Sequence, residues 1–138
     1  MAPGRGVSYT PVGPLVVVHV IAAATLVASA AVVGAWGLAR SRRLVDPARV
    51  REGKVFAHVL QLSHTLVLAT GMIGLFLLAE GRRADDPLHA RVYGPFMVVA
   101  IIAAYGYRTS SSVTNVRIFG VASLVILALG ARAFATGA

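Results

Sequence analysis

Four long runs of hydrophobic residues, separated by short polar connectors, account for most of the sequence. They cover residues 14–39, 55–79, 88–107 and 115–134. An α-helix rises about 1.5 Å per residue, so about 20 apolar residues cross the hydrocarbon core of a bilayer. The pattern therefore predicts an all-α integral membrane protein with four transmembrane helices. The fourth run has the shortest apolar part, Ile118 to Ala131, and it spans only if Arg117 and Arg132 extend their side chains toward the two interfaces.

The connectors are too short to hold a further domain, so we expect residues 1–138 to form a single membrane domain. Short connectors make consecutive helices antiparallel neighbours, which predicts an up-down-up-down bundle. Asp86 followed by Pro87 is a start signal for the third helix. The polar residues 109–112 can supply a cap for the fourth helix.

Small residues recur in all four runs, and in lipid such residues mark the faces where helices pack closely. We therefore expect the glycines of the runs to lie against neighbouring helices. Among them are Gly34, Gly71, Gly74, Gly94, Gly120 and Gly130.

The composition excludes a soluble protein and a nucleic-acid binder. Of the 138 residues, 57% are hydrophobic and only 13% are charged, which is too few charges to cover a soluble domain of this size. The net charge of +8 is not spread over a solvated face, because six of the 13 basic residues lie between the first two apolar runs. That concentration is a topology signal rather than a nucleic-acid patch.

The basic residues also predict the orientation in the cell (plasma) membrane. The connector 40–54 holds those six, whereas Arg5 is the single basic residue before the first run. The positive-inside rule places the 40–54 connector in the cytoplasm and both termini outside. Residues 28–30 resemble a signal-peptide cleavage site, but the apolar run continues through Trp36 and basic charge follows it. Both features favour a retained span.

The residues available for chemistry inside the spans are few. The sequence has no cysteine, which excludes disulfides, thiolate metal sites and covalently attached haem. All five acidic residues fall in connectors. A proton- or sodium-coupled transporter usually needs an acid at membrane depth, so this distribution disfavours one. It also disfavours an acid–base enzyme, and we expect a carrier or accessory subunit rather than an enzyme.

Histidine is the remaining ionisable residue, and two of the four histidines match in depth. With the spans centred near Val27 and Val98, His19 and His89 lie about 12 and 13 Å from the midplane on the outer side. Their helices, the first and third, are parallel and diagonal in an up-down bundle. Two imidazoles so placed can ligate the iron of one haem b. The alternatives are a backbone hydrogen bond for His19 and an interfacial cap for His89.

The other two histidines have no partner at matching depth. His64 lies about 5 Å on the cytoplasmic side of the midplane, in a polar cluster with Gln61 and Ser63. It is a candidate ligand or quinone contact, or it holds helices together by hydrogen bonds. His58 is expected at the cytoplasmic interface.

Arginines at the outer surface can bind the carboxylates of such a cofactor. Arg91 is the main candidate, with Arg82 and Arg83, because arginine pairs with carboxylates through two parallel hydrogen bonds. Tyr93 is a further hydrogen-bond donor. This arrangement resembles that of four-helix membrane b-type cytochromes, which hold haem between histidines of bundle helices. The fourth helix has no histidine, unlike the usual two-haem pattern, so the resemblance implies at most one haem.

Three functions remain open from the sequence. The first is a small haem-b-binding electron-transfer protein or a membrane subunit of a respiratory redox complex, passing electrons between an outer donor and a quinone or partner subunit. The second is a non-catalytic accessory or assembly subunit of a larger membrane complex. The third is a small oligomeric transporter.

Overall fold

The computed structural model describes residues 13–137 and is entirely helical over them. Four helices are long, and the connector regions hold one short α-turn, one 3-10 turn and one π-turn. The elements in chain order are α1 (Pro14–Ala39), α2 (Ser41–Leu44), η1 (Pro47–Arg49), α3 (Val50–Ala79), η2 (His89–Tyr93), α4 (Gly94–Gly106) and α5 (Ser112–Thr136). The all-α prediction is confirmed. The N-terminal tail with Arg5, which was predicted to lie on the outer side of the membrane, is not among the described residues.

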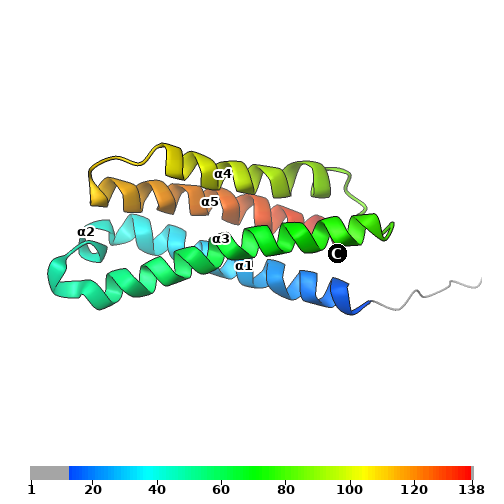
Figure 1. The fold of residues 1–138 in the computed structure, drawn as a ribbon, viewed down its shortest axis with the longest axis horizontal. Coiled ribbons are helices and arrows are strands. Elements are labelled where there is room, and N and C mark those ends of the chain that lie inside the picture. The colour runs from blue at the N-terminus through cyan, green and yellow to red at the C-terminus, as the bar shows by residue number, and fades with distance from the viewer. Residues whose placement is uncertain (1–12, 138) are drawn as a thin grey trace, which may run out of the picture.

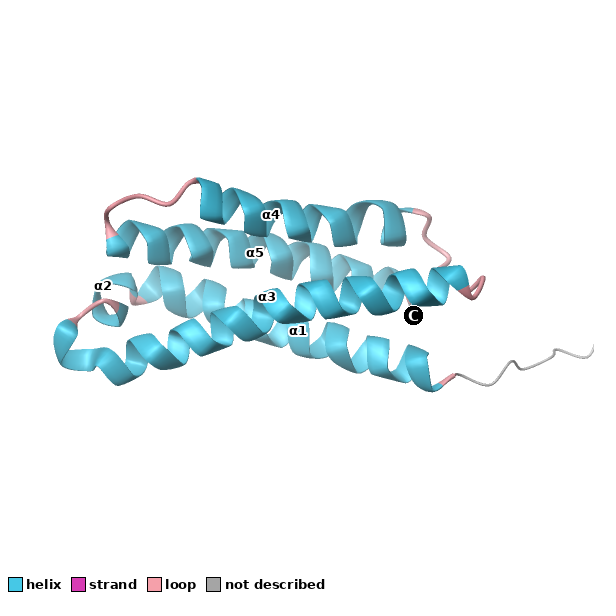
Figure 2. Cartoon of the chain, in the orientation of Figure 1, coloured by secondary structure: helices cyan, strands magenta, loops and turns pink. Residues whose placement is uncertain are grey.

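The long helices lie side by side, and each runs opposite to the previous one (Figures 1 and 2). Helix α1 packs most extensively against α5 and α3, whereas α4 packs mainly against α5 and only sparsely against α3. We call the end with the connectors 40–49 and 107–111 the basic end. We call the other end, where α1 begins and α5 finishes, the terminal end.

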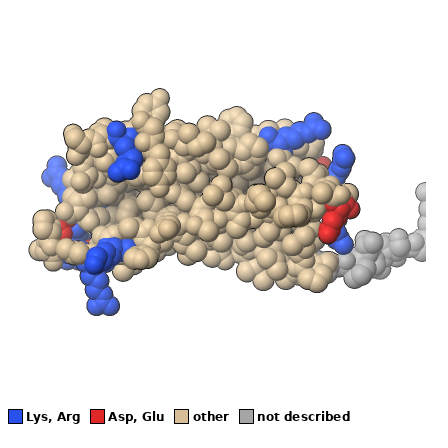
Figure 3. Space-filling view, in the orientation of Figure 1, with Lys and Arg blue, Asp and Glu red and all other residues tan. Residues whose placement is uncertain are grey.

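Within residues 13–137, three helices are long and apolar enough to cross a membrane. They span Pro14–Ala39 with 26 residues, Pro47–Ala79 with 33 and Ser112–Thr136 with 25. Charged side chains gather toward the two ends of the molecule, and the visible face between them carries none (Figure 3). An uncharged band between charged ends suits a lipid environment. Helix α4 is shorter, with 13 residues, and follows directly on the five residues of η2.

The predicted helix bounds are close to the observed ones, with two informative differences. Helix α3 begins at Val50, five residues before the expected apolar run, because α2 and η1 fold the connector back against its first turn. A Cβ at Gly53 would lie 2.6 Å from the Leu44 carbonyl oxygen, so the contact needs glycine. The predicted cap of the fourth helix is confirmed, since the Ser111 hydroxyl accepts the Thr114 N–H at 3.3 Å.

The second difference is the start of the third long helix. The Asp86 side chain accepts the Leu88 N–H at 2.8 Å, but the regular hydrogen-bonded turns begin only at His89, as the π-turn η2. Pro95 explains the wider turn. It has no N–H for the Arg91 carbonyl, and its ring crowds that carbonyl, so a regular α-turn does not pass through this point.

The predicted glycine contacts are confirmed between α1 and α5 and for Gly74, which lies against His19 of α1, but are wrong for Gly71 and Gly94. A Cβ at Gly34 would lie 2.5 Å from Leu124 Cδ2, and one at Gly120 would lie 3.2 Å from Leu38 Cγ. By contrast, a Cβ at Gly71 or Gly94 would meet nothing within 4 Å. These two glycines do not bring helices together; they line a groove between α3 and α4.

Candidate cofactor site

His19 of α1 and His89 of η2 face each other at the terminal end. Their ring centroids lie 6.3 Å apart, with an angle of 59° between the ring planes. Both rings are half-buried. The Nδ1 atom of each is buried and has no hydrogen-bond partner within residues 13–137. The structure therefore brings together the pair that the depth argument selected, and it leaves ring nitrogens of both uncommitted.

Two cavities lie on opposite sides of this histidine pair. One is a groove of about 520 Å³ between α3 and α4, and the other is a small cavity of about 80 Å³ between α1 and α5. Four residues line both cavities: His19, Thr70, His89 and Met97. The two histidines thus belong to the wall that the two cavities share. A flat molecule between their rings could extend into both cavities.

The groove is left open by glycines, which have no side chain to fill it. Gly71, Gly74 and Gly94 line the groove, where larger residues would fill it. A Cβ at Gly74 would already lie 3.4 Å from His19 Cε1. At the end of α5, a Cβ at Gly137 would overlap the ring of His89. Glycines thus leave room both for the histidine rings and for the groove beside them.

The mouth of the groove is polar and basic. A third cavity of about 270 Å³ is lined by three basic residues, Arg82, Arg83 and Arg91, and by two acidic ones, Asp85 and Asp86. It shares Gly74, Leu78 and Ala90 with the groove. Arg82 lies 3.9 Å from Glu80, a distance at which an exposed ion pair contributes little. The arginines predicted to bind carboxylates are therefore gathered at one opening, next to an apolar groove.

Tyr93 has a different role from the one expected. Its hydroxyl donates to Asp86 Oδ2 at 3.0 Å, whereas the sequence suggested a cofactor contact. The Leu88 N–H on Asp86, together with the Tyr93 hydroxyl and the nearby charges of Arg132 and His89, keeps the pKa of this carboxyl below its usual value despite partial desolvation. Asp86 is thus a carboxylate at neutral pH and a good acceptor.

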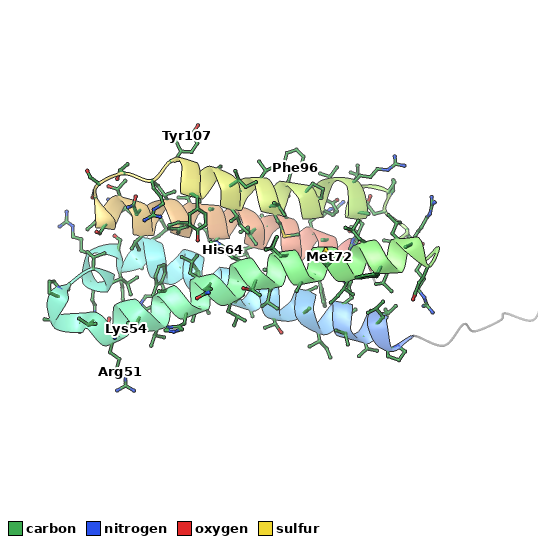
Figure 4. All side chains as sticks on the ribbon, viewed as in Figure 1. Arg51, Lys54, His64, Met72, Phe96 and Tyr107 are labelled. Carbon is green, nitrogen blue, oxygen red and sulfur yellow. The ribbon has the colours of Figure 1, made fainter. Side chains whose placement is uncertain are left out.

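His64 is not part of this site. It lies nearer the basic end than Met72 of the groove (Figure 4). Its ring packs against Tyr105 and Phe119, with centroids 5.9 and 6.0 Å away, and its Nε2 is buried without a partner in the described chain. None of the three cavities touches it. His58 is exposed at the basic end, as expected, where its Nδ1 lies 2.6 Å from the Lys54 carbonyl oxygen.

The sequence interpretation missed the groove, although two signals pointed to it. Gly71 and Gly74 fall one turn apart on α3, on the side that carries Thr70 and Val67. Pro95 marks the place where the third helix cannot be regular. The sequence interpretation treated the two glycines as packing residues and Pro95 as part of a span. It therefore did not predict a groove between α3 and α4 beside His89.

The arrangement offers two imidazole rings whose buried Nδ1 atoms have no partner in the described residues. Beside them lie an apolar groove and an opening that three arginines line. Within residues 13–137, no three or more histidine or acidic side chains group together as a metal site built from protein ligands alone. Comparisons with protein-family models, with curated proteins and with solved structures find no match for this chain.

Proposed function

We propose that the protein is a four-span membrane protein that holds one haem b between His19 and His89 and serves in electron transfer. The observation that carries the proposal is the position of this pair, with ring centroids 6.3 Å apart and a cavity on each side. Haem b supplies one-electron oxidation and reduction when bound.

The spacing of the two rings suits bis-histidine ligation. Imidazole nitrogens bind a metal such as zinc at about 2.0–2.1 Å. Two imidazoles that would hold one iron must therefore be close neighbours. The observed 6.3 Å is therefore compatible with such a ligand pair. Packing alone does not require two polar rings with unpaired nitrogens to meet at this spacing.

The surroundings suit the rest of the cofactor. The groove is lined mainly by apolar side chains and glycines, which accept a flat apolar ring and exclude water. The mouth holds Arg82, Arg83 and Arg91, which can pair with two carboxylates. The roles we assign to this chain are ligation by His19 and His89, charge pairing by the arginines, and water exclusion by the groove. A quinone or a partner redox subunit would exchange electrons with it.

The fourth crossing is η2 with α4. These five and thirteen consecutive residues extend about 27 Å at about 1.5 Å per residue, close to the ~30 Å core of a bilayer. We place the basic end in the cytoplasm, and both termini outside, in the plasma membrane. Because the chain has no cysteine, Ala48→Cys, Ala84→Cys and Ser110→Cys each introduce a single thiol.

A membrane-impermeant maleimide on intact cells tests this topology. Cysteine at position 84 should react, and cysteines at 48 and 110 should react only after lysis. If cysteine 110 instead reacts from outside like cysteine 84, η2 with α4 does not cross the membrane and the four-span arrangement is wrong.

The experiment for the cofactor is a reduced-minus-oxidised absorption spectrum of the protein purified in detergent from haem-replete cells. The wild type should give the sharp α-band of low-spin haem b. His19→Ala and His89→Ala should each abolish that band. His58→Ala is the matched control, because this exposed histidine lies at the basic end, and its spectrum should be unchanged.

Two results would overturn the assignment. A colourless wild type would remove the haem proposal and leave an accessory subunit as the better explanation, to be pursued through copurifying partners. A band that survives both His19→Ala and His89→Ala would keep the haem and reject this ligand pair.

A further inference from the structure

A hydrogen bond joins a residue before the π-turn that carries His89 to the last residue of that turn. Asp86 precedes η2 and Tyr93 is its last residue, and the Tyr93 hydroxyl donates to Asp86 Oδ2 at 3.0 Å. The other carboxylate oxygen accepts the Leu88 N–H at 2.8 Å, and the Asp86 carbonyl accepts the His89 N–H at 3.1 Å. One acidic residue therefore joins the start of the turn to its end.

Tyr93 also contacts the His89 ring directly. The two ring centroids lie 6.4 Å apart, with the planes almost perpendicular at 88°, an edge-to-face arrangement that aromatic rings favour. Tyr93 is only 7% exposed and belongs to the core cluster with Leu26 and Met97. His89 thus lies between a ring fixed in the core and the glycine at position 137, so its orientation depends on Tyr93.

The turn needs such support because π-turns are rare and their geometry is unfavourable compared with a regular helix. Relaxing the extra residue of the turn would rotate the residues before it by roughly 100° about the helix axis, the angle of one α-helical residue. His89 would then leave the space that it shares with His19. Pro95 promotes the irregular turn but does not fix which way His89 points.

We infer that Asp86 and Tyr93 are positioning residues whose hydrogen bond holds His89 in the orientation needed to act as a ligand opposite His19. This inference rests on the proposed haem function for its purpose, but the orientation of His89 is a property of the chain itself. It is therefore testable in the haem-free protein as well.

The test compares Tyr93→Phe with Tyr107→Phe. The first keeps the ring against His89 and removes only the hydroxyl. The second makes the same change on a tyrosine that is 75% exposed beyond the end of α4. With haem bound, Tyr93→Phe should convert part of the low-spin spectrum to high-spin and raise the fraction that binds carbon monoxide several-fold. Tyr107→Phe should match the wild type.

Asp86→Asn supplies the second arm. It should change the spectrum in the same direction, because one carboxylate oxygen is replaced by an amide NH₂ group. Since both variants break one bond, the double variant should be no worse than the more severe single variant, which is the signature of a coupled pair. In the haem-free protein, histidine labelled with carbon-13 should show the His89 ring signal broadened or split in both variants.

The outcomes separate this inference from the proposed function. A coloured wild type whose spectrum and His89 signal are unchanged by Tyr93→Phe rejects the positioning role alone. A colourless wild type whose His89 signal responds to Tyr93→Phe, but not to Tyr107→Phe, rejects the haem and keeps the positioning role. Additive effects in the double variant would show that the two residues act separately, which also overturns the inference.

Discussion

The two ends of the bundle use glycine in opposite ways. Toward the basic end, glycines of α1 and α5 let these helices approach until a Cβ at Gly37 would lie 3.2 Å from the Val116 carbonyl oxygen. Toward the terminal end, Gly71 and Gly94 face open space and line the groove between α3 and α4. Glycine therefore allows α1 and α5 to pack closely toward the basic end, whereas toward the terminal end it leaves a groove unfilled. We call these the closed half and the open half.

The surroundings of the histidines also differ between the two halves. His64 in the closed half is enclosed by aromatic rings and touches no cavity, although its Nε2 is unpaired in the described structure. His19 and His89 in the open half border two cavities. An unpaired buried nitrogen is therefore common to all three, and it is the adjacent space that distinguishes a candidate ligand from a packed residue.

The largest expected effect comes from closing the open half. Gly71→Leu and Gly94→Leu each place a side chain in the groove, where nothing blocks it, and we expect the haem content of the purified protein to fall more than about tenfold, with the fold retained. Haem-to-protein ratio and circular dichroism measure the two quantities. Gly106→Leu is the control, since a Cβ there also meets nothing within 4 Å and Gly106 lies outside the groove. Full haem content in Gly71→Leu would contradict the site.

The same substitution in the closed half should act on stability instead. Gly37→Leu forces a side chain between the Val116 carbonyl and the Phe56 ring, both about 3.2–3.3 Å from the Cβ position. Overpacking of this kind costs about 1–3 kcal/mol or more of unfolding free energy. Gly71→Leu in haem-free protein should change it by less than about 0.5 kcal/mol, as surface substitutions usually do. Denaturant unfolding in detergent compares them, and equal losses would mean that the two ends are packed alike.

The hydrophobic pattern was sufficient to predict the helices, because each apolar run is long and the connectors carry clear polar and capping signals. The bounds of α1 matched, and the Ser111 cap was found where the sequence placed it. Depth counted along the helices also selected His19 and His89, since helix rise is nearly constant. These are features that a single helix determines by itself.

The groove and the π-turn could not be predicted in this way, because they depend on how two helices lie relative to each other. The sequence does not distinguish a glycine that faces a neighbouring backbone, such as Gly120, from a glycine that faces an opening, such as Gly94. The pairing of Tyr93 with Asp86 was missed because positions 86 and 93 of a regular helix share a face but lie about 10.5 Å apart along the axis. In the structure Asp86 precedes the π-turn rather than starting a regular helix, and the two side chains meet.

A smaller effect is expected from His64→Leu, which sharpens the contrast among the histidines. The ring lies among Tyr105 and Phe119 with an unpaired Nε2, so an apolar side chain of similar size should leave stability unchanged or raise it by up to about 1 kcal/mol. The absorption spectrum should be unchanged, whereas His19→Leu should lose it. A loss of the α-band in His64→Leu would make His64 a ligand and would reject the division between the two halves.

The smallest effect is expected at the surface of the basic end, where an ion pair adds to the packing of Leu44 that joins the connector to α3. Arg43 binds Glu52 through two parallel hydrogen bonds, Nη2 to Oε1 at 2.8 Å and Nε to Oε2 at 2.9 Å. Both side chains are partly exposed, at 41% and 30%, so water and salt screen the attraction. Glu52→Gln should lower Tm by no more than about 3 °C at low salt, and the difference should vanish near 1 M salt, where the screening length is about 3 Å. A salt-independent fall as large as that of Gly37→Leu would mean that the pair, and not the α1–α5 glycine contact, closes this end.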